Sequence, residues 1–283
     1  MAVFTNFATL SYNGVTTNSN VVTGEILQSI SATKTAVVPE YSADGDVTYV
    51  VSLVNSSTAT VNGLSVTDDL GGYAFGTDTI YPLSLIDGSV RLYVNGVLQP
   101  APTVSAGPPA VIGGISVPAG GNAIIIYEAA VTRFAPLAAT DTIVNTVTVD
   151  GAGLASPVTA AETITAREDA DLTVSKAVNP AVITENGQLT YTFAIENSGN
   201  ADADATDNVI LSDTFDPILT DLTVVYNGTV WTENVNYTYD ETTGVFTTLP
   251  GQITVPAATY TQNADGEWVR SPGIATLSIT GTV

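Results

Sequence analysis

The chain contains only two lysines, Lys34 and Lys176, and each occupies the same place in a segment that occurs twice. The residues two positions before and after each lysine are apolar: Ala32 and Ala36 for Lys34, and Val174 and Val178 for Lys176. Because alternate residues of a strand point to opposite faces of a sheet, both lysines are expected to face an apolar core. An unpaired ammonium group is costly there, so it needs partners or loses its proton.

An aspartate and an asparagine share this inward orientation with each lysine. They lie in alternating series of apolar residues at 64–70, 209–215, 143–149 and 4–10. Each complete domain would then hold one inward Lys, one inward Asp and one inward Asn. The two sets are Lys34, Asp68 and Asn145, and Lys176, Asp213 and Asn6.

A long internal repeat underlies this pairing of sites. SATKTAVVP at 31–39 matches TVSKAVNP at 173–180, and DVTYVVSLVNSS at 46–57 matches QLTYTFAIENSG at 188–199. Three later pairs of segments match in the same order: 63–70 with 208–215, 115–120 with 253–258, and 122–131 with 274–283. Short Val, Ile, Thr and Tyr runs of period two, separated by Gly, Pro, Asn and Asp, predict an all-β chain of two sandwiches in tandem.

The two repeats end differently. The first continues into residues 140–166, which are expected to form a two-stranded hairpin, whereas the second stops at Val283. Residues 2–27 align with that hairpin, with Asn6 on Asn145 and Glu25 on Glu162. The sequence therefore predicts donor strands at 1–28, a complete sandwich at 29–168 and an incomplete C-terminal sandwich at 169–283.

An incomplete sandwich has unpaired backbone groups at its edge, and each such buried group costs about 1–3 kcal/mol. A strand supplied by a neighbouring chain would repair the edge by β-augmentation. About seven residues join the hairpin to the first sandwich and span roughly 23 Å, so reaching back within one chain is difficult. A head-to-tail homopolymer follows. The alternative is that 2–27 is an extra edge hairpin on the first sandwich and that the second is a short variant.

The Lys-bearing first strand, the Asn-Ser turn and the closing Asn-x-Val-Thr-Val strand resemble the "conserved repeat" family, domain of unknown function 11, of bacterial and archaeal surface proteins. This resemblance implies an immunoglobulin-like sandwich. The inward residues also look like the isopeptide triads of Gram-positive pilins and collagen-adhesin domains. There a Lys on the first strand attacks an Asn on the last, helped by a buried acid.

That resemblance implies an intramolecular bond between Lys34 and Asn145 with Asp68 as the acid. It also implies an intermolecular bond between Lys176 and Asn6 with Asp213. An apolar site lowers the pKa of the lysine and raises that of the aspartate, which suits amine attack and loss of ammonia. This is single-turnover chemistry and not an enzyme activity. The alternatives are a Lys–Asp salt bridge with Asn as a hydrogen-bond partner, or another strand register.

The composition of the chain excludes several kinds of site, catalytic machinery and partner. The absence of Cys and His excludes disulfides, thiolate or imidazole metal sites and Ser/His or Cys/His catalysis. A net charge of −22 argues against nucleic acid and anionic membranes as partners. No apolar stretch reaches the ~18 residues that membrane insertion requires, and the N-terminus does not read as a signal peptide. No cofactor is implied.

The sequence thus predicts a fibre subunit outside the cell, on a cell or spore surface, with an adhesive target left open. The second hypothesis is a monomeric surface adhesin or stalk module that binds a glycan or a host protein. A hydrolase has no residue constellation in its favour. Asp202, Asp204 and Asp207 are weak calcium candidates, with a solvated acidic loop as the alternative. Trp231 and Trp268 could line a carbohydrate surface or pack in the core.

Overall fold

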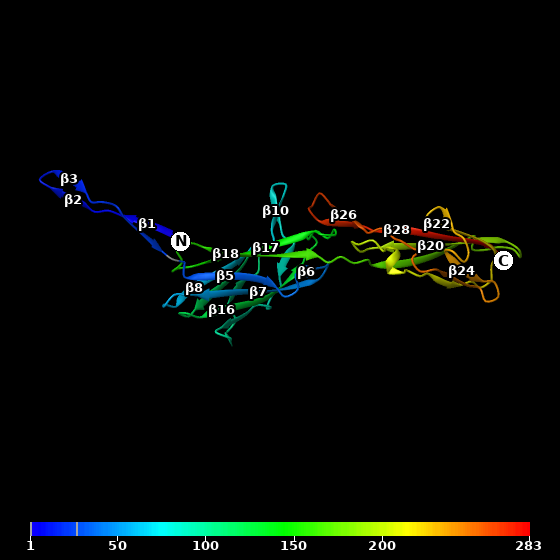
Figure 1. The fold of residues 1–283 in the computed structure, drawn as a ribbon, viewed down its shortest axis with the longest axis horizontal. Coiled ribbons are helices and arrows are strands. Elements are labelled where there is room, and N and C mark those ends of the chain that lie inside the picture. The colour runs from blue at the N-terminus through cyan, green and yellow to red at the C-terminus, as the bar shows by residue number, and fades with distance from the viewer. Residues whose placement is uncertain (1, 27) are drawn as a thin grey trace. The chain divides into compact units, whose positions relative to one another are not determined.

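The computed structural model describes residues 2–26 and 28–283, which separate into two units (Figure 1). Unit 1 contains the described residues up to Pro136 together with Asp141–Ala166, and unit 2 contains Leu137–Thr140 and Arg167–Val283. Within the described residues, the only helix is the short 3₁₀-helix η1 (Ala205–Asp207), so the all-β prediction is confirmed. No helix in this part of the chain is long and apolar enough to span a bilayer.

Unit 1 is a sandwich of two sheets and a small hairpin. The strands of the first sheet are β5 (Ile30–Ala36), β7 (Asp46–Asn55), β11 (Leu83–Leu85), β12 (Arg91–Val94), β13 (Val97–Leu98) and β16 (Asn122–Val131). The strands of the second are β6 (Glu40–Tyr41), β8 (Val61–Asp68), β14 (Thr103–Ser105), β15 (Ala110–Val117), β17 (Thr142–Asp150) and β18 (Val158–Ala166). β9 (Tyr73–Phe75) pairs with β10 (Asp78–Ile80).

The two sheets pack face to face, since buried side chains of both form one core. The first runs β13-β12-β16-β7-β5, with β11 also on β16, and the second runs β14-β15-β8-β17-β18-β6. Alternate residues of β7 and β17 are buried, as the period-two pattern predicts. The core between the sheets includes Tyr49, Val51 and Leu53 of β7 and Val147 and Val149 of β17.

Unit 2 repeats part of this arrangement. Its larger sheet consists of β19 (Leu172–Asn179), β20 (Gln188–Asn197), β22 (Thr220–Tyr226), β23 (Thr229–Val230) and β28 (Gly273–Thr282), in the order β19-β20-β28-β22-β23. A three-stranded sheet of order β21-β25-β24 consists of β21 (Ser212–Thr214), β24 (Tyr237–Asp240) and β25 (Val245–Thr248). β26 (Thr259–Gln262) pairs with β27 (Trp268–Ser271). Figure 1 shows β20, β22 and β28 together in unit 2, as it shows β5, β7 and β16 in unit 1.

The two units differ at one edge. In unit 1, β8 pairs with β15 on one side and with β17 on the other. In unit 2, β25 pairs with β21, and no strand among the described residues pairs with the other edge of β21. The Lys-bearing strands keep the same register, since Lys34 lies opposite Val51 and Lys176 opposite Phe193. The repeat therefore extends to strand register, and unit 2 lacks the counterparts of β17 and β18.

The N-terminal segment folds on itself as β1 (Ala2–Asn6), β2 (Thr9–Tyr12), β3 (Val15–Asn18) and β4 (Val22–Ile26). β1 pairs with β4 and β2 with β3, and every residue from Val3 to Thr23 is exposed. Asn13 and Gly14 both have positive φ and form the tight turn typical of a two-residue hairpin. We call residues 2–26 the N-terminal hairpin.

The register of the N-terminal hairpin differs from that of its aligned counterpart. Asn6 lies opposite Val22, whereas Asn145 lies opposite Glu162. The alignment of Glu25 with Glu162 therefore does not carry over into pairing within the free hairpin. The reason is local: the Asn13–Gly14 turn sets the register of β2 and β3, whereas a long connection joins β17 to β18.

Candidate functional site

Lys34 and Asp68 meet in the core of unit 1. Lys34 lies on β5 of the first sheet and Asp68 on β8 of the second, and their side chains are 0% and 1% exposed. Lys34 Nζ lies 3.0 Å from Asp68 Oδ2. The Tyr127 hydroxyl on β16 also donates to Asp68 Oδ2, and the backbone N–H of Leu70 donates to Asp68 Oδ1 at 2.8 Å. The carboxylate is thus held by one ammonium, one phenol and one amide.

Two aromatic rings surround the Lys34 ammonium. Its Nζ lies 4.5 Å from the ring centroid of Tyr49 and 5.9 Å from that of Tyr127. Burial lowers the pKa of Lys34 from its ordinary value, and the negative charge and hydrogen bond of Asp68 oppose this without reversing it. A lysine with a lowered pKa releases its proton more easily and becomes a neutral amine nucleophile.

Asn145 lies on β17, the strand next to β8, with Val147 of β17 directly opposite Asp68. Its side chain is fully buried, and neither Nδ2 nor Oδ1 has a hydrogen-bond partner in the structure. An unsatisfied buried carboxamide costs about 1–3 kcal/mol and calls for an explanation. The neighbouring strand β18 places Glu162 opposite Asn145, and the charge of Glu162 also acts on Lys34 to raise its pKa.

Unit 2 holds an open version of this site. Lys176 Nζ pairs with Asp213 Oδ2, and Lys176 Nζ lies 4.3 Å from the ring centroid of Tyr191. The side chains are 39% exposed for Lys176 and 19% for Asp213, against almost complete burial for Lys34 and Asp68. Since no described strand takes the place of β17, nothing in unit 2 corresponds to Asn145.

Asn6 lies exposed on β1 in the N-terminal hairpin. The structure therefore brings Lys34 together with Asp68 and Lys176 together with Asp213, and it buries Asn145 on the adjacent strand. Sequence reasoning missed two participants, Tyr49 and Tyr127. Tyr49 carried a signal, because Tyr49 and Tyr191 each lie 15 residues after their lysine.

The calcium candidates serve local structure. Asp204 caps η1 and Asp207 completes its capping box, while Asp202 accepts a hydrogen bond from the backbone N–H of Ala257 at 2.7 Å. Within the described part of the chain, no group of three or more acidic side chains is arranged to hold a metal ion. Trp231 is buried and stacks on Tyr226 at 4.7 Å between ring centroids, as expected for core packing.

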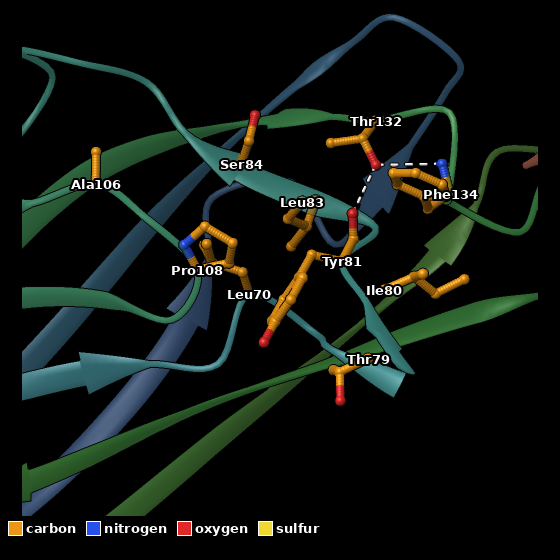
Figure 2. A pocket seen from close by; sticks show the side chains of 10 residues that line it. All are labelled: Leu70, Thr79, Ile80, Tyr81, Leu83, Ser84, Ala106, Pro108, Thr132 and Phe134. Atoms are coloured by element: carbon orange, nitrogen blue, oxygen red, sulfur yellow. Dashed lines mark hydrogen bonds between the residues drawn. The ribbon is translucent and has the colours of Figure 1, made fainter. Parts of the chain in front are cut away.

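Unit 1 also contains a hollow of about 320 Å³ beside β10 and β11 (Figure 2). Its lining is largely apolar, including Leu70, Ile80, Leu83 and Pro108. The hydroxyl of Thr132 donates to the Tyr81 carbonyl at 2.7 Å and accepts from the backbone N–H of Phe134. None of the predicted site residues lines this hollow.

The family model that matches the chain is CARDB, over residues 169–263, which is less than half of the chain. A search of curated proteins finds no match. The resemblance to domain of unknown function 11 stays a prediction.

Solved structures similar to the chain include three bacterial surface proteins. The pilus backbone RrgB from Streptococcus pneumoniae is 12% identical with a TM-score of 0.35, covering 86% of this chain and 55% of that one. The chain thus spans about half the length of RrgB. BcpA, the major pilin subunit of Bacillus cereus, is 10% identical with a TM-score of 0.37, and the match covers 96% of this chain and 73% of BcpA. The collagen-binding domain of a Staphylococcus aureus adhesin is 10% identical with a TM-score of 0.31, and the match covers 50% of this chain and 99% of that domain. With likeness this distant, function rests on the geometry of the chain itself.

The buried ion pair predicts a large stability effect in unit 1. In an Asn145→Ala background, where no bond to Lys34 can form, Asp68→Ala leaves the Lys34 ammonium buried without its carboxylate. We expect a loss of about 3–5 kcal/mol in the free energy of unfolding of unit 1, measured by urea titration. In the same background, Lys34→Met with Asp68→Ala removes both charges and should recover most of that loss. Equal stability of the two variants would contradict the ion-pair interpretation.

Proposed function

We propose that the protein is the structural subunit of an extracellular fibre on a cell or spore surface. The N-terminal hairpin of one copy completes unit 2 of the next, so that the subunits form a head-to-tail homopolymer. An isopeptide bond between Lys176 and Asn6 seals each junction, and one between Lys34 and Asn145 locks unit 1.

The observation that carries this proposal is the exposed inner face of unit 2. Val174 and Val178, which flank Lys176 on the inward side of β19, are 61% and 41% exposed. Apolar side chains that face a sandwich interior and yet contact water, beside an unpaired strand edge, indicate a surface that another strand covers.

The N-terminal hairpin has the properties of the covering element. Phe4 and Leu10, on the same alternating series as Asn6, are 51% and 66% exposed. By the repeat alignment, Phe4 takes the position of Ile143, which is buried in unit 1. A matched apolar surface on donor and acceptor favours β-augmentation.

A hollow of about 340 Å³ in unit 2 suits the Phe4 ring. Leu189, Tyr191, Pro217 and Val283 are among the residues that line it. Pro217 aligns with Gly72 of unit 1, and Ile143 in unit 1 packs against the adjacent Gly71. Phe4 would thus enter the hollow as the apolar anchor of the docked hairpin.

The covalent step balances without an added reagent. Lys176 Nζ first passes its ammonium proton to Asp213 and then attacks the Asn6 side-chain carbonyl carbon, so that a C–N bond to Nζ forms and the bond to Nδ2 breaks. One proton moves from Nζ to Nδ2 through Asp213, and ammonia leaves. Unit 1 contains the same groups in a dry environment, which supports the same reaction between Lys34 and Asn145.

The direct test is whether purified full-length protein polymerises. We expect size-exclusion chromatography to show a concentration-dependent series of oligomers, and negative-stain imaging to show thin unbranched filaments. A chain that stays monomeric with its N-terminal hairpin intact would contradict the fibre model and favour the monomeric adhesin.

A further inference from the structure

The Tyr49 hydroxyl is a buried polar group that the ion pair does not use. Tyr49 is 0% exposed, and its hydroxyl has no hydrogen-bond partner in the structure. It shares this condition with both polar atoms of the Asn145 side chain. Buried hydroxyl and carboxamide groups normally find partners, so unsatisfied groups within one site point to a role outside the resting state.

Strand register places Tyr49 beside the reacting groups. Tyr49 lies on β7 opposite Ala36, two residues along β5 from Lys34 and on the same inward face. Lys34 Nζ lies over its ring at 4.5 Å. Burial raises the pKa of the Tyr49 hydroxyl, and the Asn145 side chain lies close enough to lower it to a smaller extent. The phenol therefore keeps its proton and is available as a donor.

We infer that the Tyr49 hydroxyl is the donor that stabilises the oxyanion formed on Asn145 Oδ1, and that Tyr191 does the same for Asn6. This inference rests on the proposed isopeptide function and adds a catalytic residue to each site.

The proposed reaction creates a negative charge that this hydroxyl can stabilise. When Lys34 Nζ adds to the Asn145 carbonyl carbon, the C–O double bond opens and Oδ1 takes the electron pair. The Tyr49 hydroxyl donates a hydrogen bond to that oxygen, while Asp68 carries a proton from Nζ to Nδ2. The C–O double bond then re-forms, ammonia leaves, and the Tyr49 proton has not been consumed. A pre-positioned donor in a water-free site is worth far more here than in water.

Tyr191 provides the same arrangement in unit 2. It lies on β20 opposite Val178, just as Tyr49 lies opposite Ala36, and Lys176 Nζ lies 4.3 Å from its ring centroid. By contrast, Tyr127 has no counterpart, because the aligned residue of β28 is Ile279. The lysine-facing tyrosine is thus common to both sites, whereas the hydroxyl that binds Asp68 is not.

The test is Tyr49→Phe in the full chain, which removes one oxygen and keeps the ring. We expect the rate of ammonia loss from unit 1 to fall about 10²–10³-fold, the usual effect of removing one oxyanion donor. Intact-mass measurements from purification onward, with Asn6→Ala present to exclude the intermolecular bond, follow this loss directly. Tyr73→Phe removes a hydroxyl of unit 1 that donates to the Phe134 carbonyl and should leave the rate unchanged.

A purely structural role would show itself in stability and not in rate. Both variants are therefore unfolded thermally, and rates are compared where both are folded. If the Tyr49→Phe variant loses ammonia as fast as the parent chain, the role of Tyr49 is overturned. The isopeptide bond itself would still stand in that case, because the parent chain does lose ammonia. For Tyr191→Phe, filaments should form normally and acquire resistance to boiling detergent only slowly. Resistance acquired at the parental rate would overturn the role of Tyr191.

Discussion

Chains that lack residues 2–27 should remain monomeric at concentrations at which full-length chains form filaments. Without the hairpin, the free edge of β21 and the exposed face around Val174 and Val178 have no strand to cover them. The lost backbone pairing amounts to on the order of 10 kcal/mol per junction, enough to remove polymerisation entirely. Size-exclusion chromatography and negative-stain imaging measure the effect.

Two controls separate loss of docking from loss of folding. Unit 1 should unfold at an unchanged temperature, because β1–β4 pair only with one another among the described strands. A separate peptide of residues 2–27, added in excess to full-length chains, should occupy unit 2 and block filament growth. Filaments formed by the truncated chain would contradict donor-strand exchange.

Lys176→Ala should convert boil-resistant filaments into filaments that fall apart to monomers in hot detergent. The docked hairpin still supplies backbone pairing and Phe4, so assembly persists, but the amine that attacks Asn6 is gone. Asn6→Ala should have the same effect from the donor side. On denaturing gel electrophoresis, assembled filaments of the parent chain should give a ladder of covalent oligomers. Filaments of either variant should give a single monomer band.

Lys34→Ala is the matched control for this experiment. It removes the corresponding amine of unit 1 and should leave the ladder between subunits intact. Labelling with an amine-reactive reagent gives an independent readout, since Lys176 is the exposed one of the two lysines. The Lys176 amine should be labelled in monomers and not in filaments, because the bond to Asn6 consumes it there. A ladder that survives Lys176→Ala would disprove the intermolecular bond.

Alternation and repetition were sufficient to predict the all-β fold and the placement of the paired residues. Lys34 and Asp68 lie far apart in the sequence, yet each belongs to a period-two series whose other members are apolar. Since that pattern assigns a face to every residue of a strand, two inward charges of opposite sign were expected to meet. The repeat then transferred the same assignment to Lys176 and Asp213.

Features set by turns and by single hydroxyls were not predictable in the same way. The register of the N-terminal hairpin follows from the Asn13–Gly14 turn, whereas alignment with β17 and β18 predicted only its place in the repeat. The tyrosines look like ordinary core aromatics in the sequence. Only the structure shows that the Tyr127 hydroxyl reaches Asp68 and that the Tyr49 hydroxyl has no partner.

The positions of the two lysines, each on the first strand of its sandwich, decide how such a fibre would carry tension. With both proposed bonds formed, a pull enters a subunit at Asn6, follows the chain to Lys34 and crosses to Asn145. It then runs through the residues between the units to Lys176 and passes to the next subunit. Residues 35–144 and 177–283 lie outside this path. Most of each sandwich would then bury the cross-links away from water and would carry none of the tension itself.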